Sequence, residues 1–328
     1  MKAFHAFEPD ADRAVALDRR MHLGLADSLQ HISEQLAGIP GFDIAALGAV
    51  ISKLRSGVRF SPGIFGWYYE LVLALLDEQE EKASHAFGNI LTSKPAGAGF
   101  VVRAMAPSAV DAECDLYRRR IGSEMTDLFQ PPAPEAVENF GERFDAGYAL
   151  LSDALPELAG EIRALVREVV LATSPDAAPF QFDGASAYQL WGLLFLNPKF
   201  HPTPVAVAEV LAHESAHSLL FGFTYDEPLV FNDDDELYSS PLRLDPRPMD
   251  GIYHATYVSA RMHWAMTRLA ASPLLDGEMR DAAIKAAASD MENFEKGYET
   301  VARHGRLSAT GEALMAGARA YISEQRAG

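Results

Sequence analysis

Apolar side chains recur at steps of three and four residues over much of this chain, and this spacing predicts amphipathic helices. Leu17, Met21, Leu25 and Leu29 show it in the first of them. Glycine as a stop signal and Ser-Pro or Thr-Pro as a start signal mark several of the ends. Helices are predicted at residues 10–36, 44–54, 64–76, 109–121, 135–151, 156–171, 204–222, 250–271, 277–304 and 310–325.

Short apolar runs predict a small β-sheet in addition to the helices. They lie at residues 100–102, 180–182 and 188–196. The last run is apolar nearly throughout, which is typical of a strand that is covered on both faces. A predicted helix follows it directly. We therefore expect a mainly α fold with a small β-sheet, of the α+β class, with a zincin-like core in which a strand precedes a helix.

A cluster of prolines divides the chain. It lies at residues 131–134, and clustered prolines are typical of boundaries and hinges. We expect a helical N-terminal region at residues 1–130, which would help to hold a peptide, and a metal-binding catalytic region at residues 131–328.

The predicted helix at 204–222 contains a His-Glu-x-x-His pattern. It is formed by His213, Glu214 and His217. Residues four apart on a helix lie on one face, so both imidazoles can approach one metal ion. The flanking residues are apolar, and burying three ionisable groups in an apolar wall is costly unless they are paired or bound to metal. The pattern therefore predicts a metal site.

A metal site of this kind needs a third protein ligand. The extended metzincin pattern would have glycine at 220 and histidine at 223, but Leu220 and Phe223 stand there, so that class is excluded. The next predicted helix offers His254 near its start and His263 further on. Nine residues separate them, so they point to opposite faces and only one can reach the metal. We prefer His254.

Other ligands remain open beside His254. The competing carboxylates are Glu209, Asp250 and the acidic run 233–236. The choice of metal is open as well. Zinc would hold a water that Glu214 could deprotonate for peptide hydrolysis. Ferrous iron would offer coordination positions to a chelating cosubstrate and dioxygen.

The segment before the His254 helix carries two arginines and a tyrosine. They are Arg243, Arg247 and Tyr238. Arginine binds carboxylates through two parallel hydrogen bonds, which suits the distal carboxylate of α-ketoglutarate. The alternative is that the two arginines only hold the loop, by pairing with Asp233, Asp234, Asp235 or Asp245.

Composition narrows the classes of function. A formal net charge of −18 and a pI near 4.9 disfavour binding to a nucleic-acid backbone. Cys114 is the only cysteine, so a disulfide within the chain and a thiolate zinc cluster are excluded. We find no signal peptide and no apolar run of about 18 residues, the length that membrane crossing needs. We therefore expect a cytoplasmic protein that does not enter the membrane.

The ordered motifs of the second half resemble a known family. His213-Glu-Ser-Ala-His217 is followed by Asp234-Asp-Glu-Leu-Tyr238-Ser-Ser-Pro241, Asp245-Pro-Arg247-Pro and Gly251-Ile-Tyr-His254. Together they look like the HExxH motif-containing peptide modification family, whose members accompany gene clusters for ribosomally synthesised, post-translationally modified peptides. The resemblance covers roughly residues 185–265.

The resemblance implies a specific activity and site. It implies a non-haem iron, α-ketoglutarate-dependent oxygenase that hydroxylates a side-chain β-carbon of a precursor peptide. His213, His217 and His254 would be the Fe(II) ligands, and Arg247, Arg243 and Tyr238 would contact α-ketoglutarate. Glu214 would then orient a ligand or a metal-bound water. The expected partner is the precursor peptide, with a leader-binding protein or a second copy of the chain as additional candidates.

Overall fold

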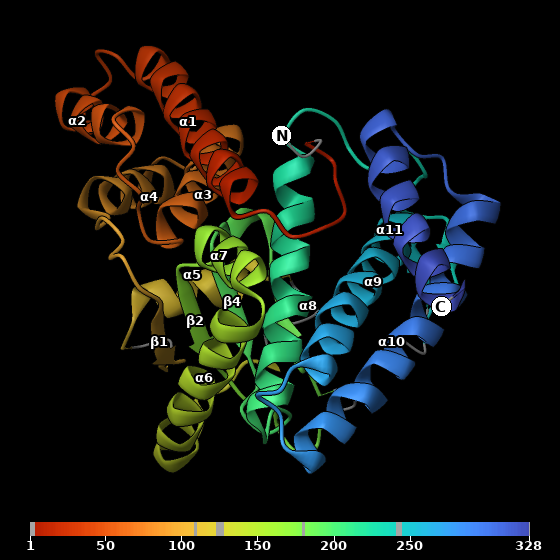
Figure 1. Cartoon of the computed structure of the whole chain (residues 1–328). Coiled ribbons are helices and arrows are strands. Elements are labelled where there is room, and N and C mark those ends of the chain that lie inside the picture. The colour runs from red at the N-terminus through yellow and green to blue at the C-terminus, as the bar shows by residue number, and fades with distance from the viewer. Residues whose placement is uncertain (1–3, 108–109, 123–127, 179–180, 241–244, 328) are drawn as a thin grey trace. The chain divides into compact units, whose positions relative to one another are not determined.

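The computed structural model describes residues 4–107, 110–122, 128–178, 181–240 and 245–327 (Figure 1). Its contacts divide the chain into two compact units, neither of which is continuous in sequence. Unit 1 comprises Met1–Ala14, Gly141–Ile162 and His201–Gly328, and unit 2 comprises Val15–Phe140 and Arg163–Phe200. The predicted division into residues 1–130, for peptide binding, and residues 131–328, for catalysis, is a division by function. It stays a prediction.

Unit 2 contains a four-stranded mixed sheet. Its strands are β1 (Val101–Ala104), β2 (Glu168–Leu171), β3 (Gly184–Ala185) and β4 (Leu193–Leu196). They are ordered β1-β2-β4-β3, with β1 and β4 parallel to β2 and β3 antiparallel to β4. Every residue of β2 and β4 is buried, as expected for continuous apolar runs in a sheet covered on both faces.

Helices make up most of the remaining described structure. Those within unit 2 are α2 (Ile44–Arg55), α3 (Gly63–Leu76), α4 (Glu80–Thr92), α5 (Ala112–Arg120) and the 3₁₀ turn η2 (Tyr188–Leu190), whereas α1 (Ala11–Gln35), α6 (Pro134–Ala154) and α7 (Pro156–Leu165) have residues in both units. Helix α3 packs against α4 and α5. Mainly helical structure with a small mixed sheet confirms the expected α+β class.

Unit 1 is built around four long helices and a short ribbon. The helices are α8 (Pro204–Phe223), α9 (Met249–Ala271), α10 (Gly277–His304) and α11 (Ala309–Ala327), and the ribbon pairs β5 (Leu237–Tyr238) with β6 (Arg247–Pro248). Helix α9 packs against α8, α10 and α11, and Figure 1 shows it between α8 and α10. Thr203 caps α8 by accepting a hydrogen bond from the Ala206 amide at 3.2 Å, and Pro204 occupies the first turn.

The structure corrects two predicted elements. The helix predicted at 156–171 ends at Leu165, and residues 168–171 form β2 instead. The apolar spacing fits both structures, but pairing with β1 and β4 satisfies the backbone of this buried segment. Of the strand predicted at 188–196, only Leu193–Leu196 form β4, whereas Tyr188–Leu190 form the 3₁₀ turn η2. Gly192 lies between them with a φ of 91°, a conformation that glycine adopts readily.

Two further differences concern short segments. Of the strand predicted at 180–182, residue 180 lies outside the described residues, and Gln181 and Phe182 are not in a strand. Helix α4 was not predicted, although its buried residues Ala83, Phe87 and Ile90 follow helical spacing. Among the helices in the described part of the chain, none combines the length and the apolar character that crossing a bilayer requires.

Candidate metal centre

Helices α8 and α9 bring the three predicted histidine ligands together in unit 1. His213 and His217 lie one turn apart on α8, with their Nε2 atoms 3.1 Å apart. His254 of α9 lies beside His217, with ring centres 5.2 Å apart and an angle of 15° between the ring planes. The Nδ1 atoms of these two rings are 3.0 Å apart. The preferred third ligand therefore lies beside the motif.

Met262 contacts the outer nitrogen of His213. Its Sδ atom lies 3.1 Å from His213 Nδ1. When Nδ1 carries the proton and donates it to sulfur, Nε2 of His213 presents a lone pair towards His217. The three close contacts then form a consistent series, in which His254 Nδ1–H donates to His217 and His217 Nε2–H donates to His213.

The site favours neutral imidazoles. Burial lowers the pKa of His217 well below its ordinary value of 6.5, and the neighbouring His213 and His254 lower it further. Burial also lowers the pKa of His254, while Asp250 acts in the opposite direction. Asp250 Oδ1 lies 4.0 Å from His254 Nε2. Since neutral imidazole is the form that binds metal, the electrostatics suit a metal site.

The distances can be tested against the dimensions of a metal site. Metal–nitrogen bonds of about 2.0–2.1 Å place two imidazole nitrogens on one ion roughly 3.0–3.4 Å apart, and the Nε2 pair of His213 and His217 meets this requirement. His254 faces the other nitrogen of His217, so a turn of a side chain would be needed for all three to share an ion. As the side chains stand, no group of three such ligands is arranged to hold a metal in the described residues. The donor types and the closest pair fit a metal, and His254 is positioned to join them.

Glu214 is the buried carboxylate of the motif. Its side chain is about 4% exposed, and Oε1 lies 3.8 Å from His213 Nε2. This position allows Glu214 either to accept a proton near a metal held by His213 or to orient a group bound there.

Among the competing ligands, Asp250 lies near His254, whereas the others have contacts of their own. Glu209 lies one turn before His213 on α8, and its charge acts on Asp290 of α10. Glu236 of the acidic run accepts a hydrogen bond from Tyr238 at 2.7 Å. His263 has its Nδ1 atom 2.8 Å from the Tyr321 hydroxyl in a buried contact.

The predicted cosubstrate contacts lie on the ribbon before α9. Tyr238 and Arg247 are opposite each other across the β5–β6 pair. Arg247 Nη2 lies 2.7 Å from Asp245 Oδ2, which is one of the pairs that would hold the loop. The Tyr238 hydroxyl donates to Glu236 and accepts from Asn232, and its ring lies against His304. Arg243 lies outside the described residues.

Sequence reasoning missed two residues of unit 1 that interact with side chains of α8. Met262 is two turns after His254 on α9, a spacing that could have singled it out. Asp290 had no local signal, because its importance comes from packing. It is 2% exposed, its Oδ2 atom has no hydrogen-bond partner among the described residues, and burial followed by the charge of Glu209 raises its pKa to about 8.

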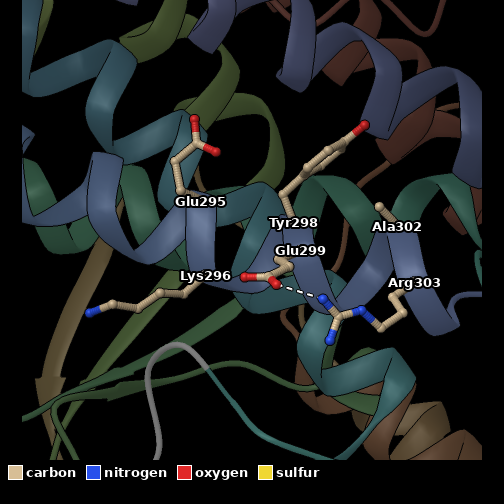
Figure 2. Close-up of a pocket in the computed structure, with 6 residues that line it drawn as sticks. All are labelled: Glu295, Lys296, Tyr298, Glu299, Ala302 and Arg303. Atoms are coloured by element: carbon tan, nitrogen blue, oxygen red, sulfur yellow. Dashed lines mark hydrogen bonds and ion pairs between the residues drawn. The ribbon is translucent and has the colours of Figure 1, made fainter.

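Unit 1 also has a hollow on its surface. A hollow on α10 is lined by Glu295, Lys296, Tyr298, Glu299, Ala302 and Arg303 (Figure 2). All of these come from one helix, and Glu299 pairs with Arg303 one turn away at 2.7 Å. A hollow formed by one helix with paired charges is typical of a solvated surface.

Comparison of the sequence with models of known protein families finds no match, and comparison with curated protein sequences finds no relative.

Proposed function

We propose that this protein is a non-haem iron, α-ketoglutarate-dependent dioxygenase that hydroxylates a side-chain β-carbon of a ribosomally made precursor peptide. The observation that carries the proposal is the cluster of His213, His217 and His254 on α8 and α9. The resemblance of the ordered motifs to the peptide modification family supplies the reaction. The zincin-like core is part of the proposal, supported by the order of β4 and α8 along the chain.

The chain's own residues have defined roles in this proposal. The imidazoles of His213, His217 and His254 would hold Fe(II). Bound iron with α-ketoglutarate and dioxygen supplies the oxidation of a C–H bond to an alcohol, with succinate and carbon dioxide as coproducts. Met262 would fix His213 with Nε2 as the free acceptor, since its sulfur lies beside Nδ1. Glu214 would orient a ligand or water at the site.

Arg247 would bind the distal carboxylate of α-ketoglutarate. It is on β6, directly before the helix that carries His254, and its side chain already pairs with a carboxylate, that of Asp245. Cosubstrate would exchange for Asp245 in this contact, with Tyr238 on the facing strand. Arg243 is a further candidate for the same carboxylate.

The proposed substrate is a precursor peptide in the cytoplasm. Residues 1–130 would contribute to holding it, and a leader-binding partner or a second copy of the chain would complete recognition. The net charge of −18 favours a peptide with neutral or basic character and disfavours nucleic acid.

One observation favours a second candidate function, zinc-dependent peptide hydrolysis. Glu214 is buried, with a carboxylate oxygen 3.8 Å from His213 Nε2, the position of a general base for a zinc-bound water. Zinc would be held by the same histidines.

One assay separates the two functions. The full chain is loaded anaerobically with iron and then given α-ketoglutarate, air and a peptide encoded by a neighbouring gene, and the products are read by mass. The hydroxylase predicts the gain of one oxygen atom in step with succinate, and this gain requires α-ketoglutarate. Cleavage without α-ketoglutarate in the zinc-loaded protein supports the peptidase and overturns the first proposal.

Glu214→Gln sharpens the same assay. A peptidase that uses Glu214 as its base should lose nearly all activity. A hydroxylase that uses it only to orient ligands should keep a measurable part, with the α-ketoglutarate requirement unchanged. Glu299→Gln, an exposed position on α10, is the matched control.

A further inference from the structure

Unit 2 contains a cavity of about 530 Å³ that none of the proposed metal-centre residues lines. It is formed where the start of α3, the end of α4 and the start of α5 meet β1 and β2. Its charged lining residues are Lys94, Arg103, Asp111, Glu113, Arg167 and Glu168. A volume of this size is in the range of small-molecule sites.

Arg167 is the unusual member of this lining. It is only 8% exposed, and its guanidinium has no hydrogen-bond or ion-pair partner among the described residues. Its position is well defined, because its amide donates to Gly192 O at 2.8 Å and its Cγ atom lies close to the same glycine. A buried charge without a counter-charge is costly, so an anion from outside the chain would complete the site.

Arg103, the half-buried cation of the cavity, is already neutralised. Arg103 Nη1 lies 2.7 Å from Asp111 and Nη2 lies 3.1 Å from Glu113, and Nε pairs with Glu168 at 2.5 Å. Three carboxylates thus share one arginine, and a negative ligand must approach Arg167 past them. A singly charged carboxylate meets less repulsion there than a doubly charged phosphate does. The exposed Lys94 at the rim has room to add a second cation.

We propose that this cavity binds one carboxylate group of a peptide. The guanidinium of Arg167 would hold it through two parallel hydrogen bonds, with Lys94 nearby. The carboxylate comes from either a chain terminus or an acidic side chain. Carboxylate binding does not rest on the proposed hydroxylase function, because it needs neither metal nor turnover. The choice of a peptide as the source of the carboxylate does rest on that function.

The test is carboxylate binding by the full metal-free chain, measured by saturation-transfer NMR and calorimetry. The probes are N-acetyl-diglycine, N-acetyl-glutamic acid 1-amide, N-acetyl-diglycine amide and inorganic phosphate. N-acetyl-diglycine, N-acetyl-glutamic acid 1-amide or both should bind roughly tenfold or more tightly than the uncharged diglycine amide. Tighter binding of the first indicates a terminal carboxylate as the natural ligand, and tighter binding of the second indicates a side-chain carboxylate. Absence of carboxylate binding, or binding of phosphate alone, overturns the proposal.

Variants locate the binding. Arg167→Met keeps the aliphatic stem and should weaken carboxylate binding roughly tenfold or more. Arg55→Met, at an exposed residue of α2 paired with Asp27, should leave it unchanged. Removing an unpartnered buried charge should also raise the Tm of Arg167→Met. Equal binding by Arg167→Met and the unaltered chain overturns the assignment.

Two further measurements guard against a variant that does not fold. Arg167→Lys keeps the positive charge but cannot donate two parallel hydrogen bonds, and it should still weaken carboxylate binding. In the unaltered chain, the bound carboxylate should slow hydrogen exchange around residues 94–97 and 110–113, which line the cavity. Slowing confined to other segments contradicts the site.

Discussion

His217 lies with its Nε2 atom 3.1 Å from Nε2 of His213, one turn earlier on the same helix. Two neutral imidazoles at this distance either share a proton or share a metal ion. Met262 and His254 occupy the outer nitrogens of the two rings, so the pair is held from both sides. We therefore expect the His213–His217 pair to bind a metal ion, and variants of the residues around it test this.

His217→Ala should abolish tight metal binding. His217 is the middle ring of the three, so its loss removes one ligand and also the ring that His254 contacts through Nδ1. The affinity for the metal should fall by more than roughly 10–100-fold, which is the loss expected when a residue that only hydrogen-bonds to a metal ligand is removed. Titration with Co(II), followed by its visible absorption, measures this. His31→Ala, at an exposed position on α1, should bind as the unaltered chain does. Equal binding by both variants would show that the motif is not the metal site.

Met262→Leu should weaken metal binding while leaving the fold intact. Leucine fills a similar volume but offers no acceptor to His213 Nδ1–H, so the imidazole is less firmly held with Nε2 free. We expect a loss of roughly tenfold in Co(II) affinity and a Tm within a few degrees of that of the unaltered chain. An unchanged affinity would mean that Met262 only fills space.

The sequence predicted those parts of the site that share one helix or lie at a helix start. His213 and His217 are paired by helical spacing alone, and His254 lies near the entry of the next long helix. Met262 and Asp290 depend on how α8, α9 and α10 pack, which no local pattern encodes. The same limit explains why β2 was predicted as the end of a helix. The apolar spacing at 156–171 fits a helix, and only the pairing with neighbouring strands makes residues 168–171 a strand. Arg167 gave no signal in the sequence, since only its burial without a partner sets it apart.

Arg247→Ala should raise the KM for α-ketoglutarate and change peptide binding little. A charge-assisted hydrogen bond contributes about 1.5–3 kcal/mol, which corresponds to an increase of roughly 10- to 150-fold. Succinate formation at varied α-ketoglutarate measures it. Arg303→Ala removes an exposed arginine that pairs with Glu299 (Figure 2) and should leave the KM unchanged. A normal KM for Arg247→Ala would remove this residue from the cosubstrate site.

Glu161→Ala should destabilise unit 1 strongly. The Glu161 carboxylate is fully buried between two arginines and is 2.9 Å from Nη2 of Arg13, while Arg261 pairs with its other oxygen. Removing it leaves two buried cations without their partner, at a cost of about 3–5 kcal/mol in the free energy of unfolding.

Urea unfolding measures the effect of Glu161→Ala. Glu299→Ala removes an exposed carboxylate from its pair with Arg303 and should cost about 1 kcal/mol or less. Similar losses for the two variants would show that the buried cluster contributes no more than a surface pair.

Asp290→Asn should stabilise the protein increasingly as the pH rises from 5 to 8. The folded-state pKa of Asp290 is raised to about 8, first by burial and then by Glu209, against 3.8 for the exposed group. A raised pKa contributes stability below 3.8 and loses it as the pH rises through 8, because unfolding releases a proton in between. Each pH unit in this window lowers the stability of the unaltered chain by up to about 1.4 kcal/mol.

Asparagine has nearly the same shape and does not titrate, so the variant escapes this loss. The difference in Tm between Asp290→Asn and the unaltered chain should therefore grow up to about pH 8 and level off above it. Asp281→Asn, at an exposed position on the same helix, should show a difference that does not change with pH. If the Asp290→Asn difference were equally constant, the carboxyl would be ionised throughout. It would then need a cationic partner in the folded state, because a lone buried carboxylate beside Glu209 would take up a proton in this range.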